Sequence, residues 1–214
     1  MIFKSLRKLF NAYASPDMSK QESCPSYTQS LEDRFKKRDF ITGKIYIPYL
    51  ELRLPLKQNQ FYKIEQVPNV AKRKNEIIME QCNIAFKFNN QLKEDTEYFG
   101  WCGRISLQQE DQLIEGYNIL IKQGLDEINR IITEAHEHGH LLWYTGNQDI
   151  FYNKYKIKPH IQKQINYNEE FAVLCGFQGL KNFGYDIFNC NLSSENSNAL
   201  SIASKVKRLA MEYL

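Results

Sequence analysis

Three of the chain's four histidines, together with a glutamate, lie within five consecutive residues. The segment HEHGH covers residues 136–140. On an α-helix, His136 and His140 lie one turn apart and about 40° apart around the axis, so both imidazoles face the same side. Two neutral imidazoles in this arrangement can bind one metal ion. The alternative is a polar helix face whose imidazoles share no ligand.

The residues between these two histidines add to the pattern. Glu137 lies about 60° from His140 around the helix, where its carboxylate would flank a metal ion without replacing an imidazole. H-E-x-x-H is the signature of zinc metallopeptidases, in which the glutamate is the general base. His138 lies about 160° from His140, so we expect it to be partly exposed or hydrogen-bonded near the site rather than metal-bound. Gly139 predicts the close approach of another element, since glycine costs a helix about 1 kcal/mol relative to alanine.

The sequence predicts a helix that carries these residues. Apolar and small residues recur at helical spacing from residue 125 to residue 142, which indicates an amphipathic helix. Asp126 is a suitable N-cap and Gly146 a suitable C-terminal stop. A catalytic zinc site also needs a third protein ligand. The segment INYNEEFAVLCGFQGL, residues 165–180, supplies candidates on a second helix.

Glu169 is the preferred third ligand. It shares a helix face with Ala172 and Gly176, and small residues on that face suit close packing against the first helix. Glu170 lies about 100° further round the helix and is the weaker choice. Asp149, in the loop between the two helices, is the other alternative.

The remaining elements predict an α+β fold. Alternating or apolar segments typical of strands lie at residues 43–56, 61–67, 84–89, 98–107 and 116–122, with a helix at 69–83. A C-terminal helix is expected to bury Ala199, Ile202, Ala203, Val206, Leu209 and Ala210. The order along the chain is therefore a series of mixed strands, the H-E-x-x-H helix, the glutamate-bearing helix and the C-terminal helix.

The chain divides into two regions by composition. Residues 1–40 comprise a basic amphipathic segment and a polar linker, and residues 41–214 are expected to form one domain. Residues 1–13 could make a weak membrane-surface contact as a short helix, or they could dock on the domain or fray. The oligomeric state is left open.

The net charge and the cysteine content indicate which partners and which cellular compartment to expect. The formal charge of +3 over 214 residues gives no reason to expect a nucleic-acid partner. The five cysteines are scattered with no C-x-x-C pair, which is typical of free thiols in a reducing compartment. No apolar run reaches the length of a transmembrane helix. We therefore expect a cytoplasmic protein.

The arrangement resembles the gluzincin class of metallopeptidases, which carry H-E-x-x-H on one helix and a glutamate on the next. The segment NEEFAVLCG (residues 168–176) is similar to the second-helix motif of the Mlc titration factor A family, and the spacing more loosely resembles ImmA/IrrE-type peptidases. The resemblance covers residues 126–180. It implies a zincin-like fold, in which a small mixed or antiparallel sheet packs on the H-E-x-x-H helix, and a zinc ion on His136, His140 and Glu169. Val173 occupies the position of an aspartate in the thermolysin-type motif, so another group must orient the histidines.

The resulting functional expectation is a zinc-dependent metallopeptidase that hydrolyses a protein or peptide substrate. Zinc would activate a water molecule, and Glu137 would act as general base. Candidates for stabilising the transition state are Tyr144, Tyr152, Tyr155, Tyr167 and His160. The alternative is a catalytically weak or inactive zincin-fold protein that binds or regulates a partner.

The resemblance also implies that an edge strand lines the substrate cleft. Residues 98–107 and 116–122 could each provide it. We favour residues 98–107, because Gly100 and Gly103 would permit a peptide chain to approach closely.

Overall fold

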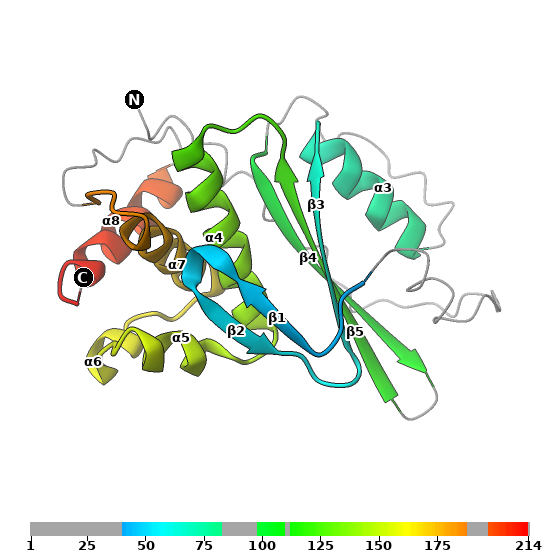
Figure 1. Ribbon diagram of the computed structural model, residues 1–214, viewed down its shortest axis with the longest axis horizontal. Coiled ribbons are helices and arrows are strands. Elements are labelled where there is room, and N and C mark those ends of the chain that lie inside the picture. The colour runs from blue at the N-terminus through cyan, green and yellow to red at the C-terminus, as the bar shows by residue number, and fades with distance from the viewer. Residues whose placement is uncertain (1–39, 83–97, 110–111, 188–196, 214) are drawn as a thin grey trace.

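A mixed three-stranded sheet with helices on both faces forms the centre of the structure, a computed structural model (Figure 1). The structure describes residues 40–82, 98–109, 112–187 and 197–213. The predictions for the N-terminal segment and for a strand at residues 84–89 lie outside these ranges. The observed α+β class, with a small mixed sheet and several helices, confirms the predicted fold class at that level.

The sheet has the order β3-β5-β4, with β3 at Gln60–Val67, β5 at Gln112–Lys122 and β4 at Gly100–Gln109. β3 runs parallel to β5, and β4 runs antiparallel to it. β4 is therefore an edge strand and β5 the central one. This order agrees with the choice of residues 98–107 as the edge segment.

Each face of the sheet has its own apolar cluster. On one face Leu120 and Trp101 pack with Val70 and Ile77 of α3 (Val70–Cys82). On the other face Ile119 belongs to the main core, which includes the buried face of α4 (Glu127–Tyr144). Successive side chains of β5 point to opposite faces of the sheet, so α3 packs on one face and α4 on the other.

The helix α4 begins and ends as predicted. The Asp126 side chain accepts a hydrogen bond from the Asn129 backbone N–H at 2.8 Å, which satisfies one of the unpaired donors at the helix N-terminus. Gly146, just beyond the last turn, has a φ of 68°, a left-handed conformation that glycine adopts readily. The histidine segment therefore lies within the second half of a capped helix.

The helices that follow α4 cover its other side. α5 (Gln148–Lys154) and α6 (Pro159–Gln162) lead to α7 (Asn168–Asn182), which packs along α4, and α8 (Ser197–Ala210) packs on α7 (Figure 1). The predicted buried face of α8 is confirmed for Ala203, Val206, Leu209 and Ala210, all of which are buried. No helix in the described ranges has the length and apolar character needed to cross a bilayer.

Gly139 allows α4 and α7 to approach each other, as its position predicted. A Cβ atom at this position would lie 2.7 Å from the Cα of Ala172 and 3.0 Å from the Cβ of Cys175. These distances are too short for an ordinary side chain. The glycine therefore sets the separation between the two helices that carry the candidate metal ligands.

Gly139→Ala is expected to lower the free energy of unfolding. Overpacking costs about 1–3 kcal/mol, and contact with a backbone atom makes that cost exceed the gain in helix propensity of about 1 kcal/mol. Urea denaturation followed by circular dichroism measures the change. Gly176→Ala is the matched control, since its nearest new contact, at 3.1 Å, is the side-chain atom Ile132 Cγ1. An unfolding free energy that rises for Gly139→Ala would contradict this account.

A two-stranded antiparallel hairpin lies beside the helices. β1 (Lys44–Ile47) and β2 (Leu52–Pro55) are joined by a 3-10 turn, η3 (Pro48–Leu50). Ile45, Ile47, Leu52 and Leu54 point into the core. Pro48 directly follows β1 and Pro55 is the last residue of β2, positions that suit proline because it cannot donate to a ladder hydrogen bond.

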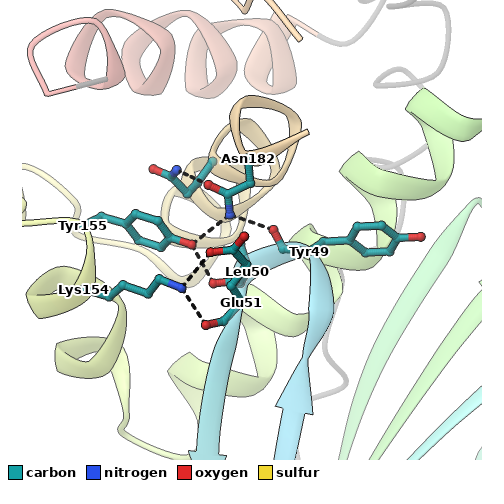
Figure 2. A network of polar contacts seen from close by, with 7 residues as sticks. Tyr49, Leu50, Glu51, Lys154, Tyr155 and Asn182 are labelled. Carbon is teal, nitrogen blue, oxygen red and sulfur yellow. Dashed lines mark hydrogen bonds and ion pairs between the residues drawn. The ribbon is translucent and has the colours of Figure 1, made fainter. Parts of the chain in front are cut away.

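Polar contacts attach the tip of this hairpin to α5 and α7 (Figure 2). The Tyr155 hydroxyl donates to the Leu50 C=O at 2.5 Å, and Asn182 Nδ2 donates to the Tyr49 C=O and to the Tyr155 oxygen, each at 2.9 Å. Lys154 Nζ donates to the Glu51 C=O at 2.6 Å. The hydrogen bonds of the Tyr155 hydroxyl thus help to attach the hairpin to the helices.

Candidate metal centre

His136, His140 and Glu169 meet between α4 and the first turn of α7. The two Nε2 atoms lie 3.1 Å apart. Glu169 Oε1 lies 3.4 Å from His136 Nε2, and Glu169 Oε2 lies 3.4 Å from His140 Nε2. The three side chains form a group that could hold a metal ion.

The separations of these atoms suit a small tetrahedral ion. Zinc binds imidazole nitrogen and carboxylate oxygen at about 2.0–2.2 Å, so two ligands of a tetrahedral site lie about 3.4 Å apart. The observed separations of 3.1–3.4 Å match that value. Both histidines are buried, and the Glu169 side chain is 17% exposed, so no large movement is needed to bring the donors together.

Asn168 orients His140. Its Oδ1 lies 2.9 Å from His140 Nδ1 and accepts the Nδ1 proton, which leaves the Nε2 lone pair directed at the cluster. The Asn168 side chain also hydrogen-bonds the Tyr144 hydroxyl. Asn168 is therefore the orienting group that Val173 cannot supply. The sequence predicted that some other group must orient the histidines, but it did not identify Asn168.

The pKa values of the three side chains in the cluster are shifted in different directions. Burial lowers the pKa of His136, but the adjacent Glu169 carboxylate outweighs burial and raises it. Burial and the charge on His136 lower the pKa of His140 to about 4. Burial raises the pKa of Glu169, but His136 outweighs it and lowers the pKa. The cluster thus favours protonation of His136 over protonation of His140, and a cation bound at the centre would oppose that protonation.

Glu137 lies beside the cluster as a buried carboxyl group. Burial and the nearby Glu169 charge raise its pKa to about 8, against the opposing charges of His136 and Lys74. The backbone N–H of Cys102 in β4 donates to the carboxylate. Oε2 has no hydrogen-bond partner among the described residues. A buried oxygen without a partner is unusual, and the raised pKa means that this carboxyl group binds a proton more readily than an exposed one.

Two glycines of β4 serve purposes other than the one predicted. A Cβ at Gly100 would lie 2.6 Å from Glu137 Oε1 and 2.6 Å from Thr133 Cγ2, so this glycine makes room for α4. A Cβ at Gly103 would lie 2.0 Å from the ring of Trp101. The expectation that these glycines admit a peptide chain is therefore wrong, because side chains of the protein occupy both spaces.

The alternative third ligands lie elsewhere. Glu170 is buried, accepts the Asn166 backbone N–H at 2.8 Å and forms an ion pair with Lys205 of α8 at 2.6 Å. Asp149 is exposed in the first turn of α5. Neither belongs to the three-residue group. The cluster therefore contains the glutamate that helical rotation favoured.

His138 points away from the cluster, as its rotation around the helix predicted, but it is buried rather than partly exposed. Its Nδ1–H donates to the Glu134 C=O at 2.7 Å, and its Nε2 accepts the Tyr62 hydroxyl proton at 2.8 Å. Burial lowers its pKa to about 4. This neutral histidine joins α4 to β3.

Of the five side chains considered for transition-state stabilisation, the structure places Tyr144 beside the cluster. Its ring stacks on His140 with 6.2 Å between centroids. Tyr152 packs in an aromatic cluster with Phe151 and Phe171, and Tyr155 holds the hairpin. Tyr167 is 67% exposed, and His160 pairs with Glu212 at 3.1 Å. The side chains of Tyr155 and His160 thus interact with partners away from the cluster.

No protein-family model matches the chain, and neither a curated protein nor a solved structure matches it.

Proposed function

We propose that the protein is a zinc-dependent peptidase with a gluzincin-type centre. His136, His140 and Glu169 hold the ion, and Glu137 is the general base. The observation that supports this most directly is the convergence of three side chains. The two imidazole Nε2 atoms lie 3.1 Å apart, each lies 3.4 Å from an oxygen of the Glu169 carboxylate, and a neighbouring carboxyl oxygen of Glu137 has no partner among the described residues. Two imidazoles and one carboxylate form a donor set that zinc prefers, with a fourth position left for water or substrate.

The roles of the side chains follow from their positions. Zinc bound at this centre supplies a Lewis acid that lowers the pKa of a water molecule and polarises a carbonyl group. Glu137 would act as the general base that takes a proton from the attacking water and as the acid that gives it to the leaving amine. The Tyr144 hydroxyl is the candidate donor to the oxyanion, since its ring lies against His140. Asn168 holds the His140 ring in position.

The free edge of β4 supports a peptide as the substrate. The Lys122 N–H donates to the Phe99 C=O at 2.8 Å, so odd-numbered residues of β4 direct their backbone groups at β5. Gly100, Cys102 and Arg104 consequently direct theirs outward. The Cys102 N–H is used by Glu137. No other described strand pairs with this edge, so an extended peptide could add to it beside the centre.

The alternative function is metal binding without turnover. A structural zinc site needs ligands but no general base, and such sites usually have four protein ligands. Glu137 forms no ion pair within the described residues and keeps one oxygen without a partner. These properties favour catalysis over a purely structural role.

Chelation provides the direct test. Zinc-loaded protein is expected to hydrolyse an unfolded protein such as casein, to lose that activity on removal of the metal with 1,10-phenanthroline, and to regain it when one equivalent of zinc is added. Mass spectrometry of the released peptides measures the hydrolysis. Near-stoichiometric zinc together with no cleavage of casein or of a peptide library would instead support the non-catalytic alternative.

A further inference from the structure

Lys74 of α3 is a half-buried cation that the proposed chemistry does not use. Its Nζ lies 5.4 Å from the ring centroid of Tyr98 and 5.9 Å from that of Trp101. Within the described part of the chain, no carboxylate forms an ion pair with it. Burial lowers the pKa of Lys74, and the one charged group that opposes this effect is Glu137.

Three other cations of the sheet region form ion pairs with carboxylates. Arg104 of β4 pairs with Glu115 at 2.5 Å. Lys63 and Arg73 both pair with Glu65, at 2.6 and 3.2 Å. Lys74 differs from them in that aromatic rings, rather than a carboxylate, surround its charge.

The position of Lys74 relates it to the candidate centre. Trp101, over which Nζ lies, belongs to the edge strand β4 and packs on the α3 face of the sheet. The preceding residue, Gly100, contacts Glu137 on the opposite face. Lys74 and Glu137 therefore lie at the same end of the edge strand, one on each side of the sheet, and within electrostatic range of each other.

We propose that Lys74, Tyr98 and Trp101 form a subsite that binds a carboxylate of the peptide substrate. The proposal rests on the proposed peptidase function. A peptide added to the free edge of β4 directs alternate side chains towards the α3 face, where this subsite lies. The half-buried Tyr98 ring would pack against the aliphatic part of an acidic residue, and Lys74, held over the buried Trp101 ring, would pair with its carboxylate. An ion pair formed in this partly desolvated place is stronger than an exposed one.

The carboxylate can come from an acidic side chain or from the C-terminus of the peptide. Two sets of acetylated hexapeptides separate these sources. In the first, all peptides have an amidated C-terminus, and a single glutamate is moved through the six positions, with glutamine versions as controls. In the second, the glutamine peptides have a free C-terminal carboxylate. The peptide set whose cleavage depends on Lys74 identifies the source of the carboxylate.

The test compares wild type with Lys74→Met, Lys74→Glu and Lys74→Arg. Lys72→Met is the matched control, since Lys72 is an exposed lysine of the same helix. For zinc-loaded protein we expect kcat/KM for the best acidic peptide to exceed that of its glutamine version by about tenfold. Lys74→Met should abolish this preference, Lys74→Glu should reverse it in favour of the glutamine peptides, and Lys74→Arg and Lys72→Met should retain it.

A binding experiment separates failure of the subsite from failure of the proposed function. Calorimetric titration of the same peptides into zinc-loaded Glu137→Gln protein measures affinity without hydrolysis. Binding that depends on Lys74, without cleavage by wild type, would support the subsite and overturn the peptidase proposal. Cleavage with equal rates for acidic and neutral peptides in wild type and Lys74→Met would overturn the subsite alone. No binding and no cleavage of any peptide would overturn both.

Discussion

Glu137→Gln is expected to reduce peptide hydrolysis by about 10²–10⁴-fold, the range that general acid–base catalysis contributes. Glutamine keeps the shape of the side chain, and with it the contact with Gly100, but it cannot accept the proton of the attacking water. The zinc content should remain that of wild type, because Glu137 does not belong to the ligand group. Parallel measurement of kcat and of metal by elemental analysis checks both expectations.

Glu134→Gln is the matched control for this variant. Glu134 lies one turn earlier on α4, is also partly buried, and has Arg130 at 4.0 Å as its nearest cation. The same chemical change there should leave turnover within about threefold of wild type, because small effects of this size are ordinary for sites away from the chemistry. Turnover by Glu137→Gln at the wild-type rate would remove the general-base assignment.

Glu169→Gln is expected to weaken zinc binding by more than about 100-fold, since loss of groups that merely support ligands already costs 10–100-fold. Glutamine removes the negative charge that raises the pKa of His136 and replaces an anionic donor with a weaker, neutral amide oxygen. Zinc retained after desalting, and competition with a chelator of known affinity, measure the change. Thermal unfolding should also lose its dependence on added zinc, because a bound ligand stabilises only the folded state.

Two further acidic residues provide controls for the ligand assignment. Glu170→Gln should retain zinc but lower the melting temperature, because the buried carboxylate pairs with Lys205 and joins α7 to α8. Asp149→Asn should change neither property, since Asp149 is exposed on α5. If Glu170→Gln loses zinc while Glu169→Gln keeps it, the assignment of the third ligand is wrong.

Much of the candidate centre follows from periodicity along the chain. The spacing of His136 and His140 predicts a shared helix face, and the observed Nε2 separation of 3.1 Å agrees. The same rotation argument separates Glu169 from Glu170 and directs His138 away from the cluster. These predictions succeed because the geometry of a helix is set by local backbone hydrogen bonds, whatever surrounds it.

Contacts between distant segments were not predicted. Asn168 meets His140 across 28 residues of sequence, and Tyr62 meets His138 across 76. The glycines of β4 were interpreted as openings for substrate, whereas Glu137 and Trp101 occupy the space beside them. No pattern in the sequence shows which side chain will fill the space next to a glycine, because that depends on how a strand and a helix dock.

The H-E-x-x-H helix, its caps and the preference for Glu169 are therefore properties of the amino-acid sequence alone. The environment of Glu137 is not determined by the local sequence alone. Its raised pKa, its unpartnered oxygen and its contact with the Cys102 N–H arise only when α4 packs beneath β4. Local spacing determines which groups can share a helix face, whereas burial and charge depend on neighbours that the chain brings together only on folding.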